Sequence, residues 1–218
     1  PPQDSLAYWH LWTEVSKRVW RDRLRYLGDP DYVEVPVELL LSRDYAAGDK
    51  IYVDADADAG GDGSSWANAY QNLQDALAVT FTGANIWVAA GIYYPDEGAG
   101  QTDGSRSSTF NIPWDVKVYG GFDGDETTLD ERDWEINITV LSGDLDQDDT
   151  GGGDNGENAY HVVSFSDVND QTFLDGFTIT AGNADGSSNE YGGGVLNISS
   201  DYHYGNPVIR NCIISGND

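Results

Sequence analysis

Phe173 opens the stretch FLDGFTIT (173–180), and Val208, 35 residues later, opens the stretch VIRNCIIS (208–215). The apolar positions of the two stretches coincide when they are aligned without a gap. Gly176 and Asn211 also coincide, and these are the residue types that best tolerate a left-handed backbone bend. A strand, a left-handed corner and a second strand, repeated at a fixed offset, predict a chain that winds into a parallel β-helix.

Similar short runs of β-branched and aromatic residues recur after residue 50. Most are followed within a few residues by Gly, Asn or Asp, which favour turns. The runs are residues 51–53, 86–88, 116–119, 138–141, 161–164, 177–180 and 212–215. Gly-rich stretches at 151–153 and 192–194 fit loops between successive turns. The alternative fold is a β-sandwich, which would show hairpin dipeptides between alternating strands at regular spacing, and few are found.

One segment breaks the β pattern. Its apolar residues recur at helical spacing: Trp66, Ala69, Tyr70, Leu73, Ala76 and Leu77. We expect a capping helix of about three turns near residues 67–79, which covers the first open coil of the solenoid. Cys212 is expected to point into the stack of coils as a small core residue.

The composition changes sharply near residue 49, which predicts two segments. Residues 1–50 hold seven basic, nine acidic and two Gly residues, whereas residues 51–218 hold four basic, 29 acidic and 24 Gly residues. Within the first segment, Tyr8, Trp12, Val15 and Val19 follow one helix face. We therefore expect a helical segment over residues 1–48 and a β-helix over residues 51–218.

The charge and the Cys count exclude several classes of protein. The net charge of −27 argues against binding to nucleic acid or to an anionic membrane. One Cys excludes an internal disulfide framework and a multi-Cys zinc site. No apolar run approaches the roughly 20 residues of a membrane span, so no membrane insertion is expected. With no Met and a Pro1-Pro2 start, the chain is expected to be part of a longer protein, and further repeats are expected after residue 218.

The first segment carries the stretch YLGDPDYV at residues 26–33, followed by Val35-Pro36. Residues 5–47 resemble a scaffold segment of the gamma-glutamyltranspeptidase large subunit. In that family, the corresponding stretch lies upstream of the self-cleavage point that frees the catalytic threonine. The resemblance therefore carries over no catalytic residue, and gamma-glutamyltransferase activity is an alternative that rests on this segment alone.

The second segment carries IYVD at 51–54, LQDAL at 73–77, IWVAAGIY at 86–93, RDW at 132–134 and TVLSGD at 139–144. Residues 51–218 resemble secreted right-handed parallel β-helix proteins of bacteria, of the pectin-lyase-like superfamily. The resemblance implies a right-handed solenoid, an extracellular or cell-surface location, and polysaccharides or other surface glycans as partners. The superfamily includes lyases, hydrolases and adhesins, so the resemblance does not choose between an enzyme and a binding module.

Two acidic runs are candidate calcium sites. The first comprises Asp54, Asp56, Asp58 and Asp62; the second comprises Asp144, Asp146 and Asp148, with Asp149 beside them. Alternating Asp residues on a bent loop can present several oxygens to one Ca²⁺ ion, which takes six to eight. Neither run has the residues of an EF-hand loop. The alternative is that both runs are solvated acidic turns.

No catalytic residue and no other cofactor site is predicted. A lyase that acts on uronates needs a base and a cation beside the substrate carboxylate. The second segment offers only four basic side chains, which are not clustered in sequence: Arg106, Lys117, Arg132 and Arg210. The sequence therefore favours a structural or glycan-binding module, with a polysaccharide lyase or hydrolase as the alternative.

Overall fold

The computed structural model describes residues 50–149, 155–186, 191–199 and 206–218, all within the unit Lys50–Asp218. The helices expected within residues 1–48 and the Gly-rich stretch at 151–153 lie outside the described residues. The Gly-rich stretch at 192–194 lies in the connection that leads into strand β10, as expected for a loop.

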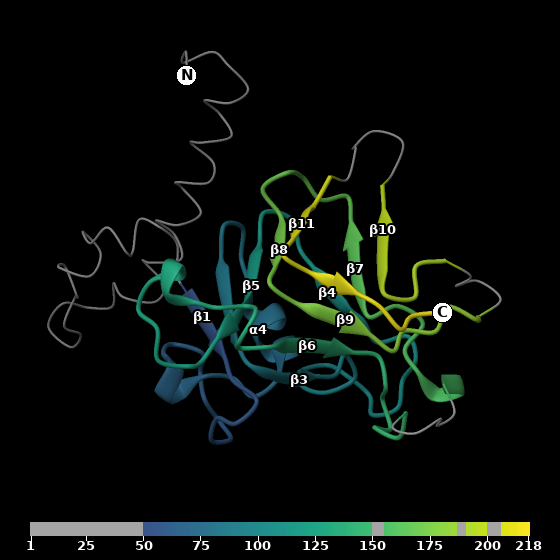
Figure 1. Ribbon diagram of the computed structural model, residues 1–218, viewed down its shortest axis with the longest axis horizontal. Coiled ribbons are helices and arrows are strands. Elements are labelled where there is room, and N and C mark those ends of the chain that lie inside the picture. Colours follow the sequence, from purple (N-terminus) through teal and green to yellow (C-terminus); the bar gives the residue numbers. More distant parts are fainter. Residues whose placement is uncertain (1–49, 150–154, 187–190, 200–205) are drawn as a thin grey trace, which may run out of the picture. The chain divides into compact units, whose positions relative to one another are not determined.

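The described part is mainly β, as predicted, with three parallel sheets and one α-helix. Sheet A comprises β1 (Lys50–Val53), β2 (Asn85–Ala89), β5 (Lys117–Phe122), β8 (Phe173–Asp175) and β11 (Val208–Arg210). Sheet B comprises β3 (Gly91–Tyr93), β6 (Thr139–Ser142), β9 (Thr178–Thr180) and β12 (Ile213–Ile214). Sheet C comprises β4 (Phe110–Ile112), β7 (Val163–Ser166) and β10 (Val195–Ile198). From β2 onward, the chain visits sheets A, B and C in that order and then begins again (Figure 1).

The predicted offset of 35 residues is the register of the last two turns. Phe173 pairs with Val208 in sheet A, and Thr178 pairs with Ile213 in sheet B. At the corner between the sheets, Gly176 has φ = 89° and Asn211 has φ = 51°. The predicted left-handed corners are therefore confirmed. The parallel pairing of the described strands also excludes the antiparallel sandwich.

Apolar residues at equivalent positions of successive turns stack inside the three sheets. One row crosses sheet A through Ile51, Ile86, Val118, Leu174 and Ile209. Such rows form because strand residues alternate between two faces and because the parallel register repeats the same position in each strand. Side chains that are wholly buried in this way stabilise the fold by about 1.5–3 kcal/mol each.

Cys212 packs against this core and is partly buried, which confirms its predicted place. Burial raises the pKa of its thiol and outweighs the backbone hydrogen bonds that lower it. The thiol is therefore protonated at neutral pH and behaves as a small apolar side chain.

The predicted capping helix is shorter than expected. A 3₁₀ turn covers Trp66–Asn68, and the helix α4 covers Leu73–Val79. The expectation of one helix over 67–79 was wrong in its first half, because Tyr70 is drawn to the edge of β1. The Tyr70 N–H donates to the Tyr52 carbonyl at 2.9 Å, and the Asp54 N–H donates to the Tyr70 carbonyl at 2.8 Å.

The helix α4 does bury an apolar face, as a capping helix should. Leu73, Ala76 and Leu77 are buried in the core. The helix contacts β1 and β4, which are the end strands of sheets A and C. Its position therefore closes the core at the N-terminal end of the sheets (Figure 1).

Candidate functional site

The candidate site develops from a row of side chains on the outer face of sheet A. The register places Tyr52, Trp87, Tyr119, Asp175 and Arg210 in line across the five strands. They lie opposite to the core row, because neighbouring strand residues face opposite sides. The row is aromatic over its first three strands and changes to an ion pair over β8 and β11.

The aromatic side chains of the row pack against one another and against neighbouring rings. The Trp87 and Phe122 rings stack with centroids 4.6 Å apart and an interplanar angle of 14°. Trp66 packs against this pair, and its indole N–H donates to the Glu126 carbonyl at 2.9 Å. This contact ties the loop that begins at Asp123 to the outer face of sheet A.

The same loop has a rigid internal structure. The Glu126 carboxylate accepts hydrogen bonds from the backbone N–H groups of Asp123, Gly124 and Asp125 at 2.7, 3.0 and 3.2 Å. A 3₁₀ turn at Leu129–Glu131 follows, with a capping box in which the side chains of Thr128 and Glu131 bond reciprocally to the backbone. These bonds explain how a polar loop holds a fixed conformation beside the sheet.

Gly121 sets how closely this loop approaches the sheet. Its φ is 91°, and a Cβ at this position would lie 2.7 Å from the Trp134 Cα. The Asp133 N–H donates to the Gly121 carbonyl at 2.8 Å. Only glycine allows both the left-handed backbone and the contact, so Gly121 positions Arg132 and Trp134 over the corner between sheets A and B.

Asp175 is the charged centre of the site. It is 0% exposed, and its Oδ2 accepts from Arg132 Nη2 at 2.9 Å and from Arg210 Nε at 2.6 Å. Its Oδ1 accepts from Asn211 Nδ2 at 2.8 Å. Arg132 also donates through Nη1 to the Gly120 carbonyl at 2.9 Å, which fixes the guanidinium at the corner.

The protonation of Asp175 follows from these contacts. Burial raises the pKa of this carboxyl, but hydrogen bonds from Arg132, Asn211 and Arg210, together with the charge of Arg132, outweigh burial and hold the pKa below its ordinary value of 3.8. The group is therefore ionised at neutral pH and cannot deliver a proton. Its role is to hold two guanidinium groups in place.

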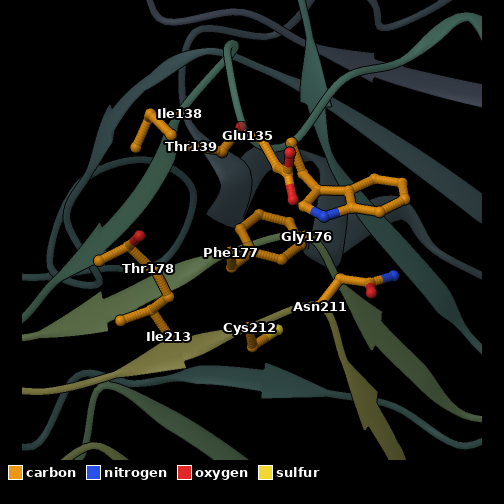
Figure 2. Close-up of a pocket in the computed structure, with 10 residues that line it drawn as sticks. Glu135, Ile138, Thr139, Gly176, Phe177, Thr178, Asn211, Cys212 and Ile213 are labelled. Carbon is orange, nitrogen blue, oxygen red and sulfur yellow. The ribbon is translucent and has the colours of Figure 1, made fainter.

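Two hollows adjoin this ion-pair network. One has a volume of about 420 Å³ and is lined by Leu129, Asp130, Arg132, Trp134, Asp175, Arg210 and Asn211. The other has a volume of about 460 Å³, and its residues come from the starts of β6, β9 and β12 and from the segments that lead into these strands (Figure 2). Trp134 and Asn211 line both, so we treat the two hollows as one groove, called here the Trp134 groove.

The Trp134 groove presents an aromatic face and several hydrogen-bonding groups that have no partner in the described part of the chain. Trp134 is 37% exposed, and the Arg132 guanidinium lies 4.7 Å from the centre of its ring. The donors are the Trp134 indole N–H and the Arg210 Nη atoms, and the acceptors are Asn211 Oδ1 and the carboxylates of Asp130 and Glu135. This combination suits a ligand that is rich in hydroxyl groups, because a hydroxyl both donates and accepts.

The structure separates the two acidic runs that were predicted as calcium sites. In the second run, Asp144 and Asp148 come together with Asp149, with one ligand atom of each residue within 4.8 Å of the others. Asp146 is not part of this group. No other group of three such residues occurs within the described ranges.

Two carboxylates of the first run, those of Asp54 and Asp62, accept hydrogen bonds within their own turns. Asp54 accepts from the Asp56 N–H at 2.9 Å, and Asp62 accepts from the Ser64 N–H at 3.0 Å. The structure does not gather Asp54, Asp56, Asp58 and Asp62 around one point. This geometry is that of Asx turns, in which a short carboxylate replaces a backbone acceptor.

The Trp134 groove was missed by the sequence reasoning. Arg132 and Arg210 were taken as scattered cations, yet both bind Asp175. In the alignment of 173–180 with 208–215, Arg210 already falls opposite Asp175. This alignment could have predicted the ion pair between them. No pattern in the sequence showed that Arg132, which lies 43 residues before Asp175, would reach the same carboxylate.

Comparisons with known proteins give one short match. The glutathione hydrolase proenzyme of Pseudomonas aeruginosa is 50% identical over 42 residues, which are 19% of this chain and 8% of that protein. This match supports the gamma-glutamyltranspeptidase resemblance of the first segment, but the chain spans only a small part of that protein. No family model matches the chain, and no solved structure matches it. No helix in the described ranges has the length and apolar character needed to cross a membrane.

Proposed function

We propose that residues 50–218 form a right-handed parallel β-helix of the pectin-lyase-like kind, which acts at the cell surface or outside the cell. The support is the order in which the chain visits the three parallel sheets, together with the stacked apolar rows inside them. Each turn adds one strand to each sheet, which is the geometry of a solenoid.

The function that the geometry supports best is glycan binding without catalysis, in the Trp134 groove. The observation that carries this proposal is the exposed Trp134 ring, which Gly121 and Arg132 position at a corner between sheets A and B. Donors and acceptors at this corner have no partner among the described residues. A sugar ring offers C–H groups to an aromatic face and hydroxyl groups to the polar rim.

The electrostatics favour a neutral glycan. Residues 51–218 carry four basic and 29 acidic side chains, for a net charge of −25. Asp130 and Glu135 line the groove, and its two Arg residues, Arg132 and Arg210, already bind Asp175. A polyanionic glycan would therefore be repelled on approach, whereas a neutral glycan would not.

The alternatives have weaker support. A glycoside hydrolase needs a general acid, which the ionised Asp175 cannot be. A lyase needs a cation beside the substrate carboxylate, and Arg132 and Arg210 already bind Asp175. Glutathione hydrolase activity is not proposed, because the match covers 8% of that enzyme.

The test is binding of the 218-residue chain to neutral and acidic polysaccharides, measured by calorimetry. Trp134→Ala should weaken the binding of a neutral glycan by about tenfold or more, because a stacked Trp commonly contributes over 1 kcal/mol. Trp114→Ala is the matched control, since Trp114 is 38% exposed, against 37% for Trp134, and does not line the groove.

Two results would overturn the proposal. One is equal weakening by Trp134→Ala and Trp114→Ala, which would show that the groove does not select the ligand. The other is binding to acidic polysaccharides alone, accompanied by unsaturated products, which would make the chain a lyase.

A further inference from the structure

A buried amide oxygen without a partner points to a second site. Asn158 is 1% exposed, and its Nδ2 donates to Asp149 Oδ2 at 2.7 Å. Its Oδ1 is also buried and has no hydrogen-bond partner among the described residues. A buried polar atom normally has a partner in the protein, in a bound water or in an ion. We therefore expect Asn158 Oδ1 to bind a water or an ion.

Three carboxylates stand beside this amide. One oxygen from each of Asp144, Asp148 and Asp149 lies within 4.8 Å of the other two. Asp144 organises the group, because its Oδ1 accepts from the Asp148 N–H at 3.0 Å and its Oδ2 accepts from the Asp149 N–H at 3.4 Å. The hydrogen bond from Asn158 Nδ2 to Asp149 places the Asn158 amide, and with it the unpartnered Oδ1, next to this group of carboxylates.

We propose that Asp144, Asp148, Asp149 and Asn158 bind one Ca²⁺ ion through their side-chain oxygens. Calcium–oxygen distances of about 2.3–2.6 Å place opposite ligands about 4.6–5.2 Å apart. The three carboxylate oxygens therefore already fit on one coordination sphere. The ligands are all oxygens, with no sulfur or imidazole, which selects Ca²⁺ over zinc.

The surroundings of the site favour a cation. No Lys or Arg of the described chain lies within 4 Å of the carboxylates of Asp144 or Asp149. Nearby, burial raises the pKa of Tyr94, and the charges of Asp144 and Glu97 raise it further. The carboxylates of Asp144 and Asp149 therefore make the potential of this loop locally negative. The nearby cation is that of Arg106, whose Nε donates to the Asn158 backbone carbonyl at 2.6 Å.

The ion would connect two parts of the fold. Asp144 follows the end of β6, and Asn158 precedes Ala159, whose N–H donates to the Gly143 carbonyl at 2.8 Å. A shared Ca²⁺ would bind the exit from β6 to the approach to β7. Calcium should therefore stabilise the folded chain, because only the folded state brings the ligands together.

The experiment measures the melting temperature and calcium affinity of the 218-residue chain, with Ca²⁺, with Mg²⁺ and with a chelator, at matched ionic strength. Ca²⁺ should raise the melting temperature and Mg²⁺ should raise it less, because Mg²⁺ demands shorter distances and stricter geometry. Equal curves in Ca²⁺ and in NaCl of the same ionic strength would overturn the proposal, since they would show only screened repulsion between carboxylates.

Variants locate the site. Asp148→Asn should weaken Ca²⁺ binding by about tenfold, because affinity follows the number of charged ligands. Asp58→Asn is the matched control: it removes one exposed carboxylate from the other acidic run and should leave affinity unchanged. Asn158→Ala removes both the ligand oxygen and the donor to Asp149, so it should weaken Ca²⁺ binding. Equal affinities for wild type, Asp148→Asn and Asn158→Ala would overturn the site.

Discussion

Asp175 and Arg210 lie opposite one another in β8 and β11, and Arg210 Nε donates to Asp175 Oδ2 at 2.6 Å. The carboxylate is wholly buried, whereas the Arg210 side chain is 50% exposed. Arg132 completes the pair from the loop before β6. One carboxylate thus joins the outer face of sheet A, the corner turn and the loop that carries Trp134, so its removal should affect both stability and ligand binding.

Asp175→Asn should lower the free energy of unfolding by about 3–5 kcal/mol, because removing one partner of a buried pair leaves uncompensated charge. Chemical denaturation measures this change. The control is Asp185→Asn: Asp185 pairs with Arg106 at 2.6 Å but is 51% exposed, so its loss should cost about 0–1 kcal/mol. An equal loss of unfolding free energy in the two variants would show that Asp175 does not hold Arg132 and Arg210 in place.

The contribution of Asp175 should depend on pH in one direction. Its pKa in the folded chain lies below the ordinary value of 3.8, because the bonds to Arg132, Asn211 and Arg210 outweigh burial. The stabilisation is therefore fully present above pH 3.8 and is lost as the pH falls through the lower folded value. The melting temperatures of wild type and Asp175→Asn should differ at pH 6 and converge in acid. A difference that is constant with pH would contradict the assignment.

Gly176→Ala should destabilise the fold more than Gly100→Ala. Both glycines have positive φ, at 89° and 75°, which costs about 1–2 kcal/mol for a residue with a Cβ. At Gly176 the new Cβ would also lie 2.9 Å from the Gly120 carbonyl oxygen, whereas at Gly100 it would meet nothing within 4 Å. The extra crowding should add about 1–3 kcal/mol, measured by thermal or chemical denaturation. Equal effects would mean that the corner relaxes freely.

The repeat at 173–180 and 208–215 correctly predicted parallel strands at an offset of 35 residues, because the two stretches share the same inward positions and the same left-handed corner. Strands β1, β2 and β5 were predicted from runs of β-branched and aromatic residues that are followed by turn-forming residues. Strands β3, β4 and β10 were missed, since runs of three or four residues give too short a pattern. The start of α4 was misjudged because the pairing of Tyr70 with β1 is a tertiary contact that no local pattern contains.

The candidate site was less predictable than the fold. The sequence contained the Asp175–Arg210 pair as aligned positions, but Arg132 and Trp134 reach it through a loop whose conformation depends on the Glu126 hydrogen bonds. In the second acidic run, the alternation of Asp residues did not show that Asp149 joins the group of carboxylates and that Asp146 does not. The difference comes from the turn that Asp144 forms with the next residues, which brings Asp148 and Asp149 together.

Cys212 provides a reporter for the Trp134 groove, because it is the only Cys in the sequence and it lines the hollow shown in Figure 2. Burial raises the pKa of its thiol above the ordinary value of 9.0, so little thiolate exists at neutral pH and alkylation of the native chain should be slow. The native rate should go on rising with pH beyond 9.0, where that of an ordinary thiol levels off, and it should become that of a free thiol in denaturant. A bound glycan should slow the native reaction further, with no effect in denaturant. Mass spectrometry of the maleimide-treated chain measures both rates. If the native chain were labelled as fast as the unfolded chain, the buried position of the thiol would be contradicted.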